Sequence, residues 1–352
     1  MTKILVIGPS WVGDMVMSQS LYITLKEQNP DCTIDVMAPG WCKPILERMP
    51  EVNHAIDMPI GHGEFNLKAR RQLGVQLRTE GYDKAFVLPN SAKSALIPWF
   101  AKIPTRIGWK GEMRYGLLSD LRPNKKDFQY MVERYVALAF PKSSMQNSAS
   151  LGGLETLPRP KLRIDVPLQQ ATLDKFGLNR DSKIYGLCPG AEFGPAKKWP
   201  ESHYAEVASA MTEKGAQVWL FGSQKDVETC NKIRSLVPDK HQSQVIVLAG
   251  QTSLIEALDL LGACDTVISN DSGLMHVAAA VGCNVVAIYG STSPKYTPPL
   301  AEKVEMVHID VECRPCFKRE CPLGHLKCLK ELPASSAIKA IRRLEESAVK
   351  TC

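Results

Sequence analysis

The chain has 352 residues, of which 44% are hydrophobic and 23% are charged, and its formal net charge is +6. This length exceeds the usual size of one hydrophobic core, so we expect two domains, residues 1–165 and residues 166–352. No apolar run reaches the roughly 18 residues of a membrane span, and residues 1–8 are too short an apolar stretch for a signal peptide, which argues against a membrane-spanning or secreted protein and favours a cytoplasmic one.

The first predicted elements are a strand from residue 3 and, after a glycine-containing turn, an amphipathic helix. Gly8 and Gly13 have the spacing of a P-loop, but Asp14 stands where a P-loop needs lysine, and no G-x-G-x-x-G is present. Because a carboxylate repels phosphates, we do not expect a nucleotide at this turn. An aspartate near a helix N-terminus suits a general base that accepts a proton from a hydroxyl, and helix N-capping is the alternative role of Asp14.

Residues 91–127 form a basic segment, with eight Lys or Arg against three acidic residues. This excess predicts an anionic partner, and Lys93, Arg106 and Arg114 are candidates to bind its anions. For each of the three, an ordinary solvated surface charge is the alternative. Nucleic acid is not the expected partner, because no aromatic stacking platform or zinc-finger spacing accompanies the charge.

Apolar strands alternate with helical stretches along the chain, which predicts an α/β architecture of parallel sheets with helices on both faces. Near residues 157–167 the proline density rises and helical periodicity is lost, which marks the boundary between two halves. The clearest further strands lie at residues 33–38, 85–88, 216–221, 245–248 and 284–289.

The second half opens with a buried strand from residue 184. A glycine- and proline-rich loop follows, and it carries Lys197 and Lys198 ahead of a helix start at Pro200. A lysine on such a loop is a mobile point charge that can neutralise a phosphate. A solvated basic loop is the alternative.

A strand that starts at residue 265 runs into Asp271, Ser272 and Gly273 and then into an apolar helix that begins near His276. A helix that opens on these residues presents unpaired N–H groups and the positive end of its dipole at the carboxyl edge of the strand, which suits a diphosphate. A simple N-cap is the alternative. The lysine loop about eighty residues earlier favours the anion site, because that loop is also of a nucleotide-binding type.

The chain has eleven cysteines. Six of them lie in strand or helix patterns as small buried hydrophobes, namely Cys32, Cys42, Cys188, Cys230, Cys264 and Cys283. A separate cluster consists of Cys313, Cys316, Cys321 and Cys328, with His325 among them. Four thiols suffice for zinc, but spacings of two, four and six intervening residues are irregular for a structural zinc site. A bound metal and a loop of reduced thiols both stay open, and a cytoplasmic disulfide is disfavoured.

Six segments that span most of the chain together resemble the lipopolysaccharide heptosyltransferases, a glycosyltransferase family. They are IGPSWVGD at residues 7–14, PNSAKSA at 89–95, GEMRYGL at 111–117, CPGAEFGPAK at 188–197, LFGS at 220–223 and NDSGLMHVAA at 270–279. Strings of this length are far more specific than a single glycine motif. The resemblance implies a GT-B fold, in which an N-terminal acceptor-binding domain and a C-terminal nucleotide-sugar-binding domain, both Rossmann-like, face each other across an interdomain cleft.

By this resemblance, the expected reaction is inverting, metal-independent transfer of L-glycero-D-manno-heptose from ADP-heptose to the first heptose of the lipopolysaccharide inner core. Asp14 would take the acceptor proton, and Lys197, with Lys198 as second candidate, would stabilise the departing diphosphate. No cofactor and no catalytic metal are expected. Donor contacts are expected from Lys198, Ser223, Asp271, Ser272, Gly273 and His276, and acceptor contacts from Lys93, Arg106 and Arg114.

One departure from the family concerns the ribose of the donor. Related heptosyltransferases can carry a carboxylate near this point, where the present chain reads Gly222-Ser223-Gln224, so the ribose contact is left open. The acceptor is a phosphorylated glycolipid, which implies peripheral contact with the inner leaflet of the membrane. Three rival functions remain: a heptosyltransferase for another core acceptor, a GT-B sugar-nucleotide enzyme such as an epimerase, and a non-catalytic nucleotide-binding module in which Asp14 merely caps a helix.

Overall fold

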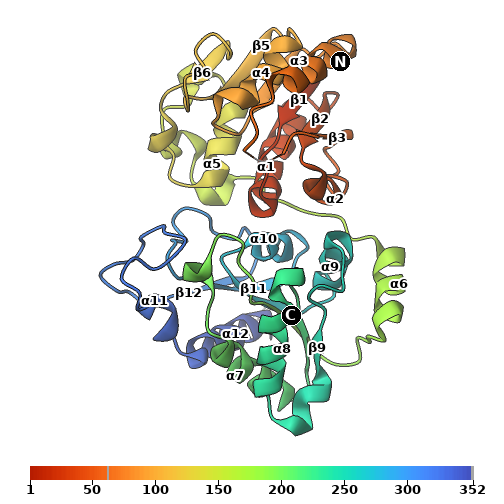
Figure 1. Ribbon diagram of the computed structural model, residues 1–352, viewed down its shortest axis with the longest axis vertical. Coiled ribbons are helices and arrows are strands. Elements are labelled where there is room, and N and C mark those ends of the chain that lie inside the picture. Colours follow the sequence, from red (N-terminus) through yellow and green to blue (C-terminus); the bar gives the residue numbers. More distant parts are fainter. Residues whose placement is uncertain (62, 350–352) are drawn as a thin grey trace. The chain divides into compact units, whose positions relative to one another are not determined.

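The computed structural model describes residues 1–61 and 63–349, and the chain divides into two compact units, Met1–Leu162 and Arg163–Cys352. Each unit contains a six-stranded parallel sheet with helices packed around it, which confirms the predicted α/β architecture (Figure 1). The division falls inside the proline-rich segment 157–167.

The first unit has the strand order β3-β2-β1-β4-β5-β6. The chain builds the sheet outward from β1 in one direction and then returns to add β4 on its other side, so the loops that leave β1 and β4 are neighbours at the carboxyl edge. The strands are β1 (Lys3–Ile7), β2 (Thr33–Ala38), β3 (His54–Asp57), β4 (Lys84–Val87), β5 (Thr105–Trp109) and β6 (Asp120–Arg122), and the α-helices are α1 (Val12–Gln28), α2 (Lys43–Leu46), α3 (Leu67–Gln76), α4 (Ala92–Phe100) and α5 (Met131–Val136).

The second unit repeats this plan with the strand order β12-β11-β10-β7-β8-β9. Here β7 and β10 are the neighbours at which the order reverses, and the loops that follow them meet at the carboxyl edge. The strands are β7 (Ile184–Cys188), β8 (Gln217–Leu220), β9 (Val245–Val247), β10 (Thr266–Asn270), β11 (Asn284–Ile288) and β12 (Val304–Val307), and the α-helices are α6 (Val166–Phe176), α7 (Glu201–Thr212), α8 (Val227–Leu236), α9 (Leu254–Leu261), α10 (Gly273–Ala280), α11 (Lys327–Lys330) and α12 (Ala334–Val349).

The central strands are buried on both faces. Every residue of β7 and of β10 is buried, because helices cover both sides of a parallel sheet and the side chains can therefore be apolar at successive positions. Trp199, at the end of the loop after β7, is 2% exposed, and its indole N–H donates to the carbonyl oxygen of Leu332 at 2.9 Å. The core of the second unit thus fixes one end of the lysine-bearing loop.

The six cysteines predicted to be buried are all buried, which confirms that prediction. Cys352 lies outside the described residues. Among the residues that the structure describes, no helix is both long enough and apolar enough to cross a bilayer.

Candidate functional site

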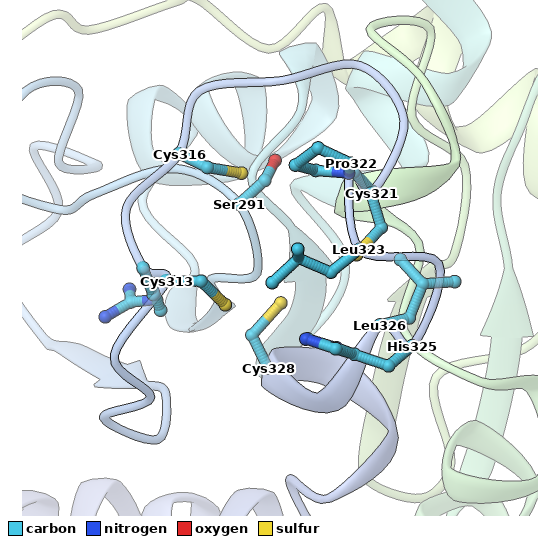
Figure 2. A pocket seen from close by; sticks show the side chains of 11 residues that line it. Ser291, Cys313, Cys316, Cys321, Pro322, Leu323, His325, Leu326 and Cys328 are labelled. Carbon is cyan, nitrogen blue, oxygen red and sulfur yellow. The ribbon is translucent and has the colours of Figure 1, made fainter.

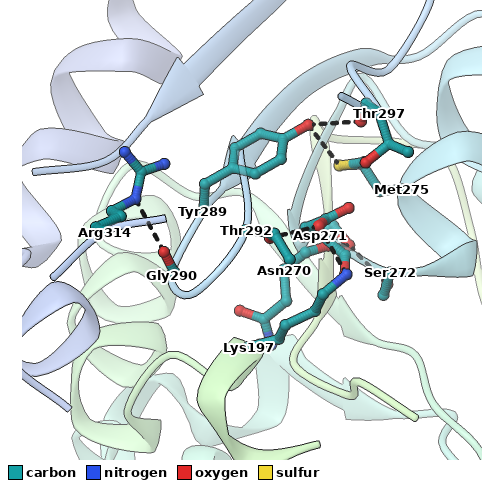
Figure 3. A network of polar contacts seen from close by, with 11 residues as sticks. Lys197, Asn270, Asp271, Ser272, Met275, Tyr289, Gly290, Thr292, Thr297 and Arg314 are labelled. Carbon is teal, nitrogen blue, oxygen red and sulfur yellow. Dashed lines mark hydrogen bonds and ion pairs between the residues drawn. The ribbon is translucent and has the colours of Figure 1, made fainter. Parts of the chain in front are cut away.

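Lys197 and Asp271 form an ion pair at the point where the strand order of the second unit reverses. Lys197 lies in the loop after β7, Asp271 directly follows β10, and the Lys197 Nζ is 2.7 Å from the Asp271 Oδ2. The hydroxyl of Thr292 donates to the same oxygen at 2.6 Å (Figure 3). The side chain of Lys197 is 13% exposed and that of Asp271 4% exposed. These contacts hold the ammonium of Lys197 in one place, close to solvent, at an edge where α/β proteins bind ligands.

Asn270, the last residue of β10, hydrogen-bonds to the loop after β7 that carries Lys197. Its Nδ2 donates to the carbonyl oxygen of Pro189 at 2.7 Å. Its Oδ1 accepts from the backbone N–H of Trp199 at 3.2 Å and from the Tyr204 hydroxyl at 3.0 Å. Asn270 is fully buried, so each of these bonds replaces a hydrogen bond to water that is not available there. The asparagine fixes the loop after β7 at both ends of its course.

The N-terminus of α10 lies beside the ion pair. Ser272 is the N-cap residue and Gly273 begins the helix, and among the described residues no side chain caps this end. Ser272, Gly273 and Leu274 are half-buried, and the first N–H groups of a helix have no partner within it, so this end is suited to an anion. Burial lowers the pKa of His276 to about 4, with Asp271 and Lys197 as its charged neighbours, so its imidazole is neutral at pH 7. Lys197, Ser272, Gly273 and His276 are thus neighbours at this edge of the sheet.

Lys198 points to a different carboxylate. Its Nζ is 3.6 Å from the Asp226 Oδ1, and its side chain is 37% exposed. The other oxygen of Asp226 accepts from the N–H of Ser223 at 3.0 Å and from its hydroxyl at 2.8 Å. A Cβ on Gly190 would lie 2.6 Å from an oxygen of Asp226, so only glycine lets this loop approach the carboxylate. Asp226 is the carboxylate next to Ser223 that sequence reasoning missed, although Ser223-Gln-Lys-Asp226 fits a capping-box spacing.

Asp14 lies in the first turn of α1, in the first unit. Trp11 is the N-cap of this helix, so the alternative role predicted for Asp14, that of N-cap, is wrong. The hydroxyl of Tyr135, on α5, donates to the Asp14 Oδ1 at 3.2 Å. Asp14 is half-buried. A carboxylate oriented by a phenol and still in reach of solvent has the properties that a general base requires.

The three basic candidates for an acceptor site have different surroundings. Lys93, in the first turn of α4, is half-buried. Arg106 donates to the carbonyl oxygens of Leu117, at 2.6 Å, and Ile103. Arg114 is 1% exposed, and its guanidinium donates to the carbonyl oxygens of Trp109 and Pro89. The solvated-charge alternative is wrong for Arg114, whose contacts identify it as a support for the loop that leads to Lys93.

Lys125 is a basic residue near Asp14 that sequence reasoning did not single out. Burial lowers the pKa of its ammonium, the guanidinium groups of Arg134 and Arg114 lower it further, and the carboxylate of Asp14 opposes them. Within the described part of the chain, no hydrogen bond or ion pair engages the Lys125 ammonium. A half-buried cation next to other cations is destabilised unless an anion joins it.

The structure therefore brings most of the predicted donor residues together and divides them into two groups, one around Asp271 and one around Asp226. Thr292 and Tyr135 donate hydrogen bonds to the candidate residues Asp271 and Asp14. A single hydroxyl in a loop or helix carries no sequence signal that would have identified it. Asp14 and the basic residues belong to the other unit.

Comparisons with known proteins point to one family. A model described as glycosyltransferase family 9 (heptosyltransferase) matches residues 70–327. Lipopolysaccharide heptosyltransferase 2 of Escherichia coli K12 is 48% identical over 343 residues, which cover 97% of this chain and 98% of the relative. Lipooligosaccharide heptosyltransferase 2 of Haemophilus influenzae is 51% identical over 347 residues, which cover 97% and 99% of the two chains.

Comparison with solved structures points to the same family. The chain is similar to the structure of E. coli ADP-heptose LPS heptosyltransferase II with a TM-score of 0.86 and 47% identity, over 97% of this chain and 98% of the other. A glycosyltransferase of family 9 from Veillonella parvula, 20% identical, has a TM-score of 0.82 over 97% of each chain, which shows the shared fold alone. The predicted GT-B fold is confirmed by the first of these matches.

Proposed function

The chain belongs to glycosyltransferase family 9, the heptosyltransferase family, and we propose that it transfers L-glycero-D-manno-heptose from ADP-heptose to the first heptose of the lipopolysaccharide inner core. The observation that carries this proposal is the identity of about one half, over nearly the whole chain, to enzymes named heptosyltransferase 2. The site residues supply a chemistry that fits such a transfer.

The donor end of the reaction is assigned to the second unit. As the bond between the anomeric carbon and the diphosphate breaks, negative charge grows on the departing ADP, and a cation already in place lowers the barrier most. Asp271 and Thr292 hold Lys197 in such a place. The N–H groups of Ser272 and Gly273 would bind the same phosphate oxygens, and neutral His276 is a further hydrogen-bond partner for them.

Lys198, Asp226 and Ser223 form the second donor group. Asp226 already accepts two hydrogen bonds from Ser223, and its carboxylate is 11% exposed. We assign this pair to the nucleoside part of ADP, because a carboxylate suits the hydroxyl groups of a ribose. Lys198 then balances the charge of Asp226 and contacts the donor less directly than Lys197 does.

Asp14 is the proposed general base. The acceptor hydroxyl oxygen attacks the anomeric carbon from the side opposite to ADP, its proton passes to Asp14, and ADP leaves with the electron pair of the broken bond, which inverts the anomeric configuration. The hydrogen bond from Tyr135 orients the carboxylate before the acceptor binds. Chemistry of this kind needs no metal ion.

The acceptor end is assigned to the basic segment of the first unit. Lys93 and Lys125 are the half-buried cations proposed to bind phosphate or carboxylate groups of the inner core. Arg114 and Arg106 support the surrounding loops through backbone carbonyls, so their effect on the acceptor would be indirect.

A peripheral contact with the membrane is also proposed, at the cytoplasmic face where the glycolipid acceptor lies. The connection between β5 and β6 exposes Met113 by 86% and Tyr115 by 63%, and the Lys110 Nζ lies 5.6 Å from the centre of the Tyr115 ring. Exposed apolar side chains beside a lysine suit the boundary between lipid and water, where anionic headgroups attract the cation.

Incubation with ADP-heptose and a panel of acceptors tests the function. Cores that carry no heptose, one heptose or two heptoses are compared by mass spectrometry of the glycolipid. The proposal predicts addition of one heptose to the monoheptosylated core alone. Preferential use of another core would assign a different acceptor, and release of ADP without a heavier glycolipid would contradict transfer.

A further inference from the structure

The loop between β12 and α11 carries four thiols but little regular structure. Residues 308–326 contain neither helix nor strand, and a stretch of that length inside a folded unit needs contacts of another kind to hold it. Cys313, Cys316, Cys321 and Cys328 line one small cavity of about 20 Å³, where a single water molecule needs roughly 10–15 Å³ (Figure 2). The cavity is thus of a size for one small ion.

Two buried hydrogen-bond donors at this cavity lack an acceptor. Among the described residues, the Nη2 of Arg314 and the Oγ of Ser291 are buried and make no hydrogen bond, and both residues line the cavity. The side chain of Arg314 is only 7% exposed, and Ser291 is 2% exposed. Leaving such donors unpaired costs about 1–3 kcal/mol each, and more for a charged group. The surroundings are therefore suited to anionic hydrogen-bond acceptors. Neutral thiols are not anionic and are only weak acceptors.

We propose that Cys313, Cys316, Cys321 and Cys328 bind one divalent zinc ion. The four thiol protons leave to solvent, four S–Zn bonds form, and no electron is transferred. Four thiolates leave the complex with net negative charge, which Arg314 and Ser291 then meet as hydrogen-bond donors. In the described residues the thiols do not yet have the geometry of a closed metal site, so binding requires them to rotate into it.

His325 is not assigned as a ligand. Its Nδ1 accepts from the N–H of Lys327 at 3.0 Å, so a neutral imidazole carries its proton on Nε2 and cannot offer that nitrogen to a metal. The free cysteines at these four positions also exclude a disulfide as the present link.

A bound zinc ion would also stabilise the loop that carries Lys197. Its effect on the donor site rests on the role proposed above for that lysine. The N–H of Ala196 donates to the carbonyl oxygen of Arg319 at 3.0 Å, and that of Ser291 donates to the carbonyl oxygen of Ala196 at 3.1 Å. Gly194 has a φ of +151°, and a Cβ there would lie 2.5 Å from the Arg319 oxygen. The cysteine loop thus sits directly against the backbone that carries Lys197.

Metal analysis and cobalt substitution of the full-length protein test the proposal. The reduced protein is stripped of metal and titrated with Co²⁺ and then with Zn²⁺. We expect one ion per chain, a near-ultraviolet thiolate-to-cobalt charge-transfer band with intense tetrahedral visible bands, and their loss when zinc displaces cobalt. Calorimetry in buffers of different ionisation enthalpy should show proton release on binding.

Cys316→Ser is the test variant, and Cys32→Ser, which removes a buried thiol of the first unit, is the matched control. Loss of a ligand should weaken zinc binding at least about 100-fold, while the control binds as the unchanged protein does. Absence of the charge-transfer band in the unchanged protein, or equal binding by both variants, overturns the proposal. The cobalt titration of the unchanged protein decides the matter even if Cys316→Ser fails to fold, and neither result depends on heptosyl transfer.

Discussion

Lys197→Met is expected to slow transfer strongly, because it removes the cation at the departing diphosphate and keeps a side chain of similar length. Loss of one preorganised charge or donor at a developing anion typically costs about 2.7–4 kcal/mol, or about 10² to 10³ in kcat. Asp271, 2.7 Å from the Lys197 Nζ, already balances part of the lysine charge, so we expect the lower end of this range, about 10². Binding of ADP should weaken about tenfold or more, since a hydrogen bond to a charged group contributes roughly 1.5–3 kcal/mol.

Lys198→Met is the matched control. This lysine is adjacent in sequence, 37% exposed and 3.6 Å from Asp226, so its loss should lower kcat less than about tenfold. The rate is followed by ADP release at saturating ADP-heptose, and ADP affinity is measured by calorimetry. Thermal unfolding of each variant checks the fold, because Asp271 loses a buried partner in Lys197→Met. A rate within about threefold of normal for Lys197→Met, or an equal loss in Lys198→Met, would refute this reasoning.

Four further outcomes are expected. Asp14→Asn should lower the transfer rate by about 10² to 10⁴ and leave ADP affinity unchanged in calorimetry, and near-normal turnover would exclude the general-base role. Transfer should persist in EDTA, provided that metal analysis shows that any ion bound by the thiolates stays on the protein during the assay. If EDTA abolishes activity and Mg²⁺ restores it, the proposed electrostatics are wrong. Arg114→Ala should reduce the free energy of unfolding by roughly 2–4 kcal/mol, because buried carbonyls lose their donor. Lys125→Gln should leave urea unfolding nearly unchanged and raise the apparent KM for the glycolipid about tenfold. The opposite pattern would reverse the two assignments. Since the pKa of His276 is lowered from 6.5 to about 4, the unfolded chain binds more protons between these values, so stability should fall as pH drops from about 6.5 toward 4. His276→Gln should flatten that part of the profile in urea unfolding at several pH values, and an unchanged profile would assign the effect to other groups.

The clearest strands were predictable because each depends on local pattern. The runs at residues 33–38 and 284–289 coincide with β2 (Thr33–Ala38) and β11 (Asn284–Ile288) to within a residue. Strand order was not predictable in this way. That Lys197 meets Asp271 follows from the pairing of β7 with β10, a long-range contact that no local periodicity encodes.

The charged residues show where sequence reasoning reaches its limit. Arg114 and Lys125 look alike in a basic segment, yet one is buried against the carbonyls of Trp109 and Pro89 and the other is half-buried without such partners. Which of them is structural depends on carbonyl groups up to 25 residues away in the chain. By contrast, Asp226 was within reach of the sequence, because its spacing from Ser223 is that of a helix-capping pair.

The most direct test of heptosyl transfer compares the unchanged protein with Asp14→Asn in one reaction mixture of ADP-heptose and monoheptosylated core. Intact-mass spectrometry of the glycolipid is read together with the amount of ADP released. We expect the unchanged protein to add the mass of one heptose, in equal amount to the ADP released, and the variant to form the product at least about 100-fold more slowly. ADP release without a heavier glycolipid, or equal product from both proteins, would contradict it.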